Sequence, residues 1–304
     1  MKVNFTMIID FRYHVVTLVA VFLALGLGII LGTNMGKTVN SGFEKQIQNL
    51  ELTYEKIRED QKALQASLNS KDYELEVANQ FQKAIVPNLI GNKLLGKRIA
   101  ILRTNTTVDF RYAKQLATIL RQAGAEVTSI TTFTGAINLN DTQLKTEIVN
   151  AFDISETDAN NILLPSIYAK IVEMIVKGQT SSQLIFLQNK SLLQLWGDYN
   201  RGYIDTVVVW GGGMLFENDF QKEIDTPVLD AVRKANIAFV GVEPSFVTDS
   251  YMKLYQVKCQ NTIDNIDTPP GQVTLVYLLA SGKKGHFGIK DTARALIPDI
   301  RLNY

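Results

Sequence analysis

The first long apolar run of the chain carries no charged residue between Arg12 and Lys37. A helix that crosses a bilayer needs about 20 apolar residues, whereas the apolar part of a cleavable signal is only about 7–15. We therefore predict a short tail over residues 1–14 and one retained transmembrane helix over residues 15–36. Flanking cations are nearly balanced, and the short tail favours a cytoplasmic N-terminus, with the bulk of the chain outside the cell membrane.

The end of this run, GTNMGKT at residues 32–38, resembles a phosphate-binding loop. Three residues separate its first glycine from Gly-Lys-Thr, where such a loop needs four. It also follows a long apolar run and not a short strand. The spacing and the context therefore exclude a phosphate-binding loop.

Small residues recur at every fourth position of the predicted span. Such a series lets two helix backbones approach closely in lipid, although glycine and alanine are also common in membrane helices generally. The unbroken register favours a helix–helix contact. The series is Ala20, Ala24, Gly28, Gly32 and Gly36.

Arg12, Tyr13 and His14 directly precede the apolar run. Cations and aromatic side chains are enriched where a helix enters the membrane interface. We expect these three residues to anchor the span at the interface. The alternative is a contact with a protein partner at the cytoplasmic face.

A heptad pattern follows the span, within a predicted coiled-coil segment over residues 37–86. Apolar residues alternate at spacings of three and four, and charges of both signs lie between them, which is typical of a coiled coil. Together with the small-residue series, this pattern predicts a parallel homodimer; the alternative is one amphipathic helix lying on the globular domain. The predicted core includes Phe43, Ile47, Leu50, Tyr54, Ile57, Leu64 and Leu68.

A hinge over residues 87–96 is expected to precede an α/β domain over residues 97–304. Short apolar strands alternate with helical segments, which predicts a Rossmann-like or flavodoxin-like parallel sheet covered on both faces. Residues 141–177 are predicted to be mostly helical and to form an insertion or a cap, and residues 282–288 to form a glycine-rich turn. The expected strands are 98–103, 126–132, 206–210 and 237–241, and the expected helices are 110–123, 228–235 and 272–280.

Composition narrows the function classes. The 304 residues carry a net charge of only +1, so no basic surface indicates nucleic acid as a partner. The single cysteine, Cys259, excludes a disulfide within the chain. The lipid bilayer and a second copy of the chain are the partners that the pattern supports, with an envelope or membrane protein as a further possibility.

One glycine run follows a predicted buried strand: Gly211, Gly212 and Gly213. Ligands of open α/β sheets bind beyond the carboxyl ends of strands, so this run is a possible ligand turn. However, Phe216 stands where a dinucleotide-binding motif would place its third glycine. A structural turn is therefore the favoured interpretation, and a ligand cradle the alternative.

No catalytic motif is present, and we predict that the protein is not an enzyme. Ser245 and His286 could form a nucleophile–base pair, but no Gly-x-Ser-x-Gly surrounds the serine. Cys259 reads as a buried small apolar residue. No cofactor is evident, and no metal ligands are assigned, because the histidines, the cysteine and the methionines do not cluster in sequence.

Three stretches resemble the MctB copper-transporter family: FRYHVVTLVAVFLALGLGIILG at 11–32, IDNIDTPPGQV at 263–273 and GHFGIKDTARALIP at 285–298. Anchor, helical rod and α/β domain also follow the order of that family. The resemblance implies copper transport or efflux and copper homeostasis, and copper is implied by it alone. It also implies an alternative: a non-catalytic coiled-coil scaffold of the envelope that recruits partners for cell-wall remodelling or division.

Overall fold

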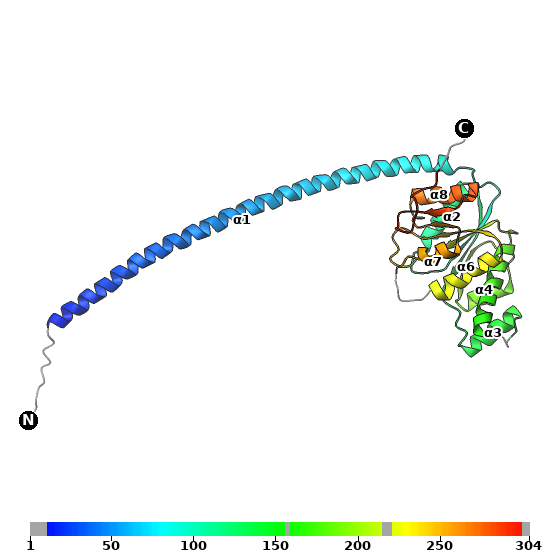
Figure 1. Cartoon of the computed structure of the whole chain (residues 1–304), viewed down its shortest axis with the longest axis horizontal. Coiled ribbons are helices and arrows are strands. Elements are labelled where there is room, and N and C mark those ends of the chain that lie inside the picture. The colour runs from blue at the N-terminus through cyan, green and yellow to red at the C-terminus, as the bar shows by residue number, and fades with distance from the viewer. Residues whose placement is uncertain (1–10, 156–158, 215–220, 300–304) are drawn as a thin grey trace, which may run out of the picture. The chain divides into compact units, whose positions relative to one another are not determined.

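The computed structural model describes residues 11–155, 159–214 and 221–299, with the side chains of 34–42 and 44 left aside. By their contacts these residues form two units, 1–78 and 79–304. The first consists of most of helix α1, Phe11–Ile90, and the second holds the end of α1 and the α/β domain (Figure 1). The predicted class, α/β with an N-terminal apolar helix, is confirmed.

The N-terminal part of α1 is a candidate membrane span over Phe11–Thr33, with a mean hydropathy of 2.7. Its threonine hydroxyls bond within the helix. Thr17 Oγ1 donates to the Tyr13 carbonyl at 2.9 Å, and Thr33 Oγ1 donates to the Ile29 carbonyl at 3.0 Å. Lipid offers no hydrogen-bond partners, so internal bonding of this kind suits a helix in a bilayer.

The C-terminal end of α1 is built into the α/β domain. The helix continues past Pro87 to Ile90, so its last turn occupies the beginning of the segment expected to be a hinge, 87–96. Burial explains this, because Ile90 and Leu94 are fully buried among the residues of the domain core. The Leu94 amide also donates to the Ala123 carbonyl at 2.8 Å, which fixes the following turn.

Seven strands form one sheet in the order β3-β2-β1-β4-β5-β6-β7, and β3 alone is antiparallel to its neighbour among the described strands. The parallel strands follow the second-first-third-fourth order of flavodoxin-like sheets, so the strand order reverses between β1 and β4. The strands are β1 Arg98–Arg103, β2 Glu126–Phe133, β3 Leu193–Gly197, β4 Thr206–Trp210, β5 Ala238–Val242, β6 Asn261–Ile263 and β7 Gly285–Phe287.

Alternate side chains of the central strands enter two hydrophobic cores, one on each face of the sheet. In β1, Ile99 and Ile101 pack with α2, α8 and the end of α1, while Ala100 and Leu102 pack with α3 to α7. Burial on both faces explains why these strands read as nearly continuous apolar runs. The helices are α2 Phe110–Gln122, α3 Thr142–Phe152, α4 Asn160–Lys177, α5 Ser182–Asn189, α6 Thr226–Lys234, α7 Met252–Lys258 and α8 Pro269–Ser281, with a π-helical turn η1 Gln221–Asp225 before α6.

The structure adds three strands to the expected elements and divides one helical segment. The glycine-rich segment 282–288 contains strand β7, which pairs with β6 over three residues. Strands β3 and β6 are also absent from the expected elements, and the three residues of β6 are too few to show a period. The helical insertion 141–177 divides into α3 and α4.

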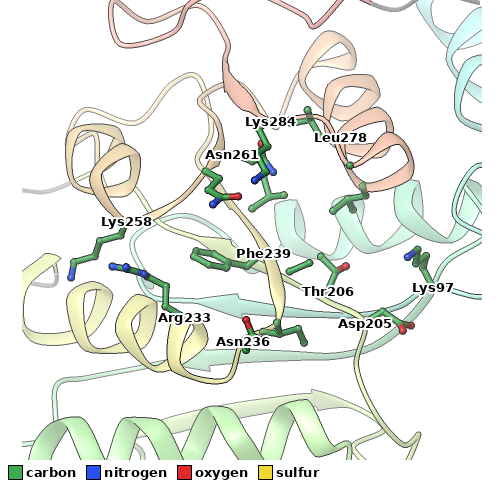
Figure 2. Close-up of a pocket in the computed structure, with 16 residues that line it drawn as sticks. Lys97, Asp205, Thr206, Arg233, Asn236, Phe239, Lys258, Asn261, Leu278 and Lys284 are labelled. Atoms are coloured by element: carbon green, nitrogen blue, oxygen red, sulfur yellow. The ribbon is translucent and has the colours of Figure 1, made fainter.

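Strands β5 and β6 separate at their amino ends. β5 pairs with β4 along all five of its residues, but with β6 only at Gly241 and Val242. A cleft of about 540 Å³ opens where the two strands part (Figure 2).

Candidate functional site

The predicted helix-packing residues lie on α1. Ala20, Ala24, Gly28 and Gly32 are exposed, and open space surrounds the position of a Cβ at Gly28 and at Gly32. At Gly36 the structure describes the helical backbone but not the exposure of the residue. The predicted contact between two spans stays a prediction, and these exposed positions leave room for it.

The predicted coiled-coil core residues are exposed on the single chain. Their exposed fractions run from 50% for Ile57 and Leu68 to 76% for Leu50. The predicted coiled coil and the alternative of a single amphipathic helix both stay predictions. The exposed core residues are Phe43, Ile47, Leu50, Tyr54, Ile57, Leu64 and Leu68.

Arg12, Tyr13 and His14 occupy the first turn of α1 and are exposed. They lie at the end of the candidate span, where an interfacial anchor would be. Their role at the membrane or toward a partner stays a prediction.

The polar residues of the α/β domain gather at the carboxyl edge of the sheet. Four parallel strands end there, and each is followed by a buried polar or glycine-rich segment: Thr104 after β1, Gly211 after β4, Glu243 after β5 and Asp264 after β6. Because parallel strands end on the same edge, these segments meet beside the point where the strand order reverses.

The glycine run 211–213 is packed against protein side chains. A Cβ at Gly211 would collide with the hydroxyl of Tyr255, and one at Gly213 would lie 2.6 Å from the amide nitrogen of Asn105. Gly212 has a φ of 79°, a left-handed conformation that favours glycine. The described contacts therefore give all three glycines a structural reason, because a Cβ at Gly211 or Gly213 would meet a neighbouring side chain and Gly212 is left-handed. The possible ligand turn stays a prediction.

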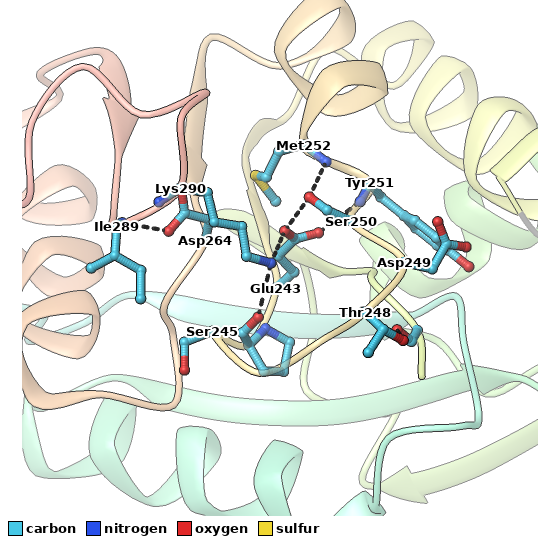
Figure 3. A network of polar contacts seen from close by, with 12 residues as sticks. Glu243, Ser245, Thr248, Asp249, Ser250, Tyr251, Met252, Asp264, Ile289 and Lys290 are labelled. Atoms are coloured by element: carbon cyan, nitrogen blue, oxygen red, sulfur yellow. Dashed lines mark hydrogen bonds and ion pairs between the residues drawn. The ribbon is translucent and has the colours of Figure 1, made fainter. Parts of the chain in front are cut away.

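Glu243 is the centre of one buried polar network (Figure 3). It is fully buried, and its carboxylate accepts hydrogen bonds from the Ser250 hydroxyl at 2.6 Å and the Tyr251 amide at 2.8 Å. Lys290 Nζ lies 2.6 Å from the same carboxylate and completes an ion pair. Burial raises the pKa of Glu243, and the bond from Lys290 opposes that rise. The pair ties the segment after β7 to the end of β5.

Asp225 is the centre of a second network on the other side of the glycine run. It is fully buried and accepts hydrogen bonds at Oδ1 from the Thr104 hydroxyl, at 2.6 Å, and from the Tyr255 hydroxyl. Its Oδ2 has no hydrogen-bond partner among the described residues. Burial raises the pKa of Asp225 to about 7, against the hydrogen bonds from Thr104 and Tyr255 that lower it. The carboxyl group is therefore able to hold a proton near neutral pH.

The residues considered for catalysis are not brought together. The Ser245 hydroxyl donates to Asp267 Oδ2 at 2.7 Å, whereas His286 Nδ1 lies 2.9 Å from the Thr262 hydroxyl. Cys259 is buried, and burial raises its pKa to about 12, so its thiol stays protonated at neutral pH. Within the described ranges, no group of three histidine, cysteine or acidic side chains forms a metal site.

Sequence reasoning missed the charged residues of both networks. A signal existed for Glu243, because a carboxylate directly after a buried strand lies at the ligand-binding edge of an α/β sheet. None existed for Asp225 or Lys290, which reach this edge from η1 and from the segment after β7.

The described residues define an α/β domain joined to a long helix that contains a candidate membrane span. The chain belongs to the family described as copper transport outer membrane protein, MctB, whose model matches residues 8–298. Similar curated proteins are the copper transporters MctB of Mycobacterium tuberculosis and Mycobacterium bovis. Each is 23% identical to this chain over 311 residues, covering 92% of this chain and 96% of the relative. The family resemblance expected from the sequence is confirmed.

Among solved structures, the N-terminal domain of TFIIH p34 aligns with 64% of this chain and all of its own, at 13% identity and a TM-score of 0.26. A likeness of that level carries no argument about fold or function.

Membership of the MctB family supports a copper transport role. The comparisons give no support to the alternative of a cell-wall scaffold.

Proposed function

We propose that the protein is a single-pass, non-enzymatic component of copper transport in the cell envelope, working as a parallel homodimer assembled through α1. Copper is its cargo, and the family supplies that assignment. The proposed orientation places the N-terminus in the cytoplasm and the α/β domain on the outer side of the cell membrane. Flanking Arg12 and Lys37 are compatible with it.

One observation carries the assembly: the apolar heptad positions of α1 are exposed on a single chain. A helix in water does not keep a long apolar seam uncovered when a second copy can cover it in register. A second copy fits because Gly36 stands one heptad before Phe43, so the small-residue series runs into the heptad seam of the same helix.

The free energy expected from burying the heptad side chains is large enough for a stable dimer. Seven core side chains from each of two chains, at about 1.5 kcal/mol each, contribute roughly 20 kcal/mol before the costs of association. Association costs about 4–15 kcal/mol in lost freedom. Transport also favours an assembly, because one helix encloses no path across lipid.

The test changes Leu50, Ile57 and Leu64 together to glutamine in the full chain. We expect the detergent-solubilised variant to be a monomer by light scattering, where the unchanged chain is a dimer. In cells that lack the protein, the unchanged chain should restore the intracellular copper content and the seam variant should not.

A matched control makes the same change to glutamine at three exposed apolar residues that lie off the heptad seam. These residues are Leu52, Tyr73 and Val77, which are 65%, 70% and 48% exposed. This control should remain dimeric and active. Unaltered copper content after deletion would refute the copper role, whereas a dimer that survives the seam change would refute only the assembly.

A further inference from the structure

The cleft between the amino ends of β5 and β6 lies on the opposite edge of the sheet from the Glu243 and Asp225 networks. About 540 Å³ of space is within the range of small-molecule sites. Its walls come from the amino ends of β4, β5 and β6, from the end of α6 and from the region around the end of α8. Neither the copper role nor the proposed dimer accounts for it.

The cleft is rich in positive charge. Four of its lining residues are cations, Lys97, Arg233, Lys258 and Lys284, against one carboxylate, Asp205. Figure 2 shows Arg233 and Lys258 beside Phe239, with Lys97 and Asp205 at the other end.

Most of that charge has no carboxylate partner among the described residues of the domain. Lys258 is paired with Asp230 at 2.6 Å, and Asp205 accepts the amide of Arg98 at 2.7 Å. Across the described ranges, no salt bridge to a carboxylate is formed by the other three cations, Lys97, Arg233 and Lys284.

The strand edge adds a backbone donor. In β5, alternate residues face opposite neighbours: the Val242 carbonyl accepts the Gly211 amide on the β4 side, while the Glu243 amide donates to the Ile263 carbonyl on the β6 side. Phe239 therefore faces the β6 side, where pairing has ended. By this alternation its N–H is directed to the side on which the cleft lies, and a half-buried peptide group needs a partner.

Further polar and apolar groups complete the lining. Asn261 Oδ1 accepts the Gly285 amide at 2.9 Å, which leaves its side-chain NH₂ available as a donor. The half-buried ring of Phe239 and the side chain of Leu278 add apolar surface. The cleft thus combines several donors and cations with a smaller apolar wall.

We propose that this cleft binds a phosphoryl group carried on a small ligand. Arginine presents a planar fork that fits phosphate oxygens, lysine adds a point charge, and a free peptide N–H adds a directional bond. Arg233, Lys284 and the Phe239 amide supply these three kinds of donor. The uncharged part of the ligand would lie against Phe239 and Leu278.

A simpler role for Arg233 is to offset the dipole at the end of α6, since cations in a last helical turn do this. A comparison of Arg233 with Lys234 distinguishes the two roles. Both residues lie in the last turn of α6, but only Arg233 lines the cleft. In the same way Lys284 lines the cleft and its neighbour Lys283 does not, because Lys283 Nζ donates to the Asp299 carbonyl.

The test measures pyrophosphate binding to the full chain in non-ionic detergent by calorimetry at low salt. We expect saturable binding to one site per chain. Arg233→Gln and Lys284→Gln should each weaken it about tenfold or more, the value of a charged hydrogen bond. The matched controls, Lys234→Gln and Lys283→Gln, should bind as the unchanged chain does. Absence of saturable binding, or an equal loss in controls and cleft variants, would overturn the proposal.

A second arm identifies the source of the phosphoryl group. Dibutanoyl phosphatidic acid, a water-soluble lipid analogue, is titrated into the same proteins. Tighter binding than that of pyrophosphate, still dependent on Arg233, assigns the cleft to a lipid headgroup, and weaker binding assigns it to a free phosphate compound. Copper content of cells does not enter either readout, so this outcome is independent of the copper role.

Discussion

Asp225 makes the stability of the α/β domain depend on pH in a direction opposite to that of a paired surface carboxylate. Its pKa is raised from 3.8 to about 7 by burial. The folded domain therefore binds this proton more tightly than the unfolded chain does. The stabilisation is fully present below a pH of about 4 and is lost as the pH rises through 7.

The size of the effect follows from the shift. One pKa unit corresponds to about 1.4 kcal/mol, so the full loss is about 4 kcal/mol, of which about 3 kcal/mol falls between pH 5 and pH 8.5. Asp225→Asn keeps the acceptor for Thr104 and Tyr255 and removes the charge. The free energy of unfolding of the variant, relative to the unchanged chain, should rise by about 3 kcal/mol over this range.

Urea unfolding followed by tryptophan fluorescence is a suitable assay for the full chain. Both tryptophans, Trp196 and Trp210, lie in strands of the sheet, so the signal reports the α/β domain and not the N-terminal part of α1. Thr104→Val removes a hydrogen bond that lowers the pKa of Asp225 and should extend the loss to higher pH. Parallel stability profiles for Asp225→Asn and the unchanged chain would refute the reasoning.

Two further substitutions test the carboxyl edge of the sheet. Lys290→Met leaves the buried carboxylate of Glu243 without its cation and should destabilise the domain by about 3–5 kcal/mol in the same assay at pH 7. A loss of stability below about 1 kcal/mol would contradict the importance of the pair. Gly211→Ala forces a Cβ against the Tyr255 hydroxyl and should lower the free energy of unfolding by about 1–3 kcal/mol. The control Gly135→Ala, where a Cβ meets nothing within 4 Å, should be close to neutral. Equal effects of the two substitutions would show that the glycine run is not tightly packed.

The fold class could be predicted because its signals are local. Strands such as Thr206–Trp210 are buried on both faces and read as apolar runs, and the apolar length of α1 is evident over Phe11–Thr33. The end of α1 was less predictable. Pro87 normally marks a helix boundary, but the burial of Ile90 and Leu94 depends on strands and helices far along the chain.

The polar networks could not be predicted for the same reason. Asp225 and Thr104 are separated by 121 positions in sequence, and Lys290 and Glu243 by 47. Neither pair has a motif, because each contact is made by tertiary packing alone. The cleft likewise results from the parting of two strands, one of which is only three residues long.

The way α1 ends also sets an order of events during synthesis. Ile90 and Leu94 share their core with Ile263 and Leu275, so their burial waits until the C-terminal part of the chain has been made. Contacts of such large sequence separation form late. The candidate span therefore emerges from the ribosome long before the domain attached to it can close, and it is complete while the α/β domain is still unfolded.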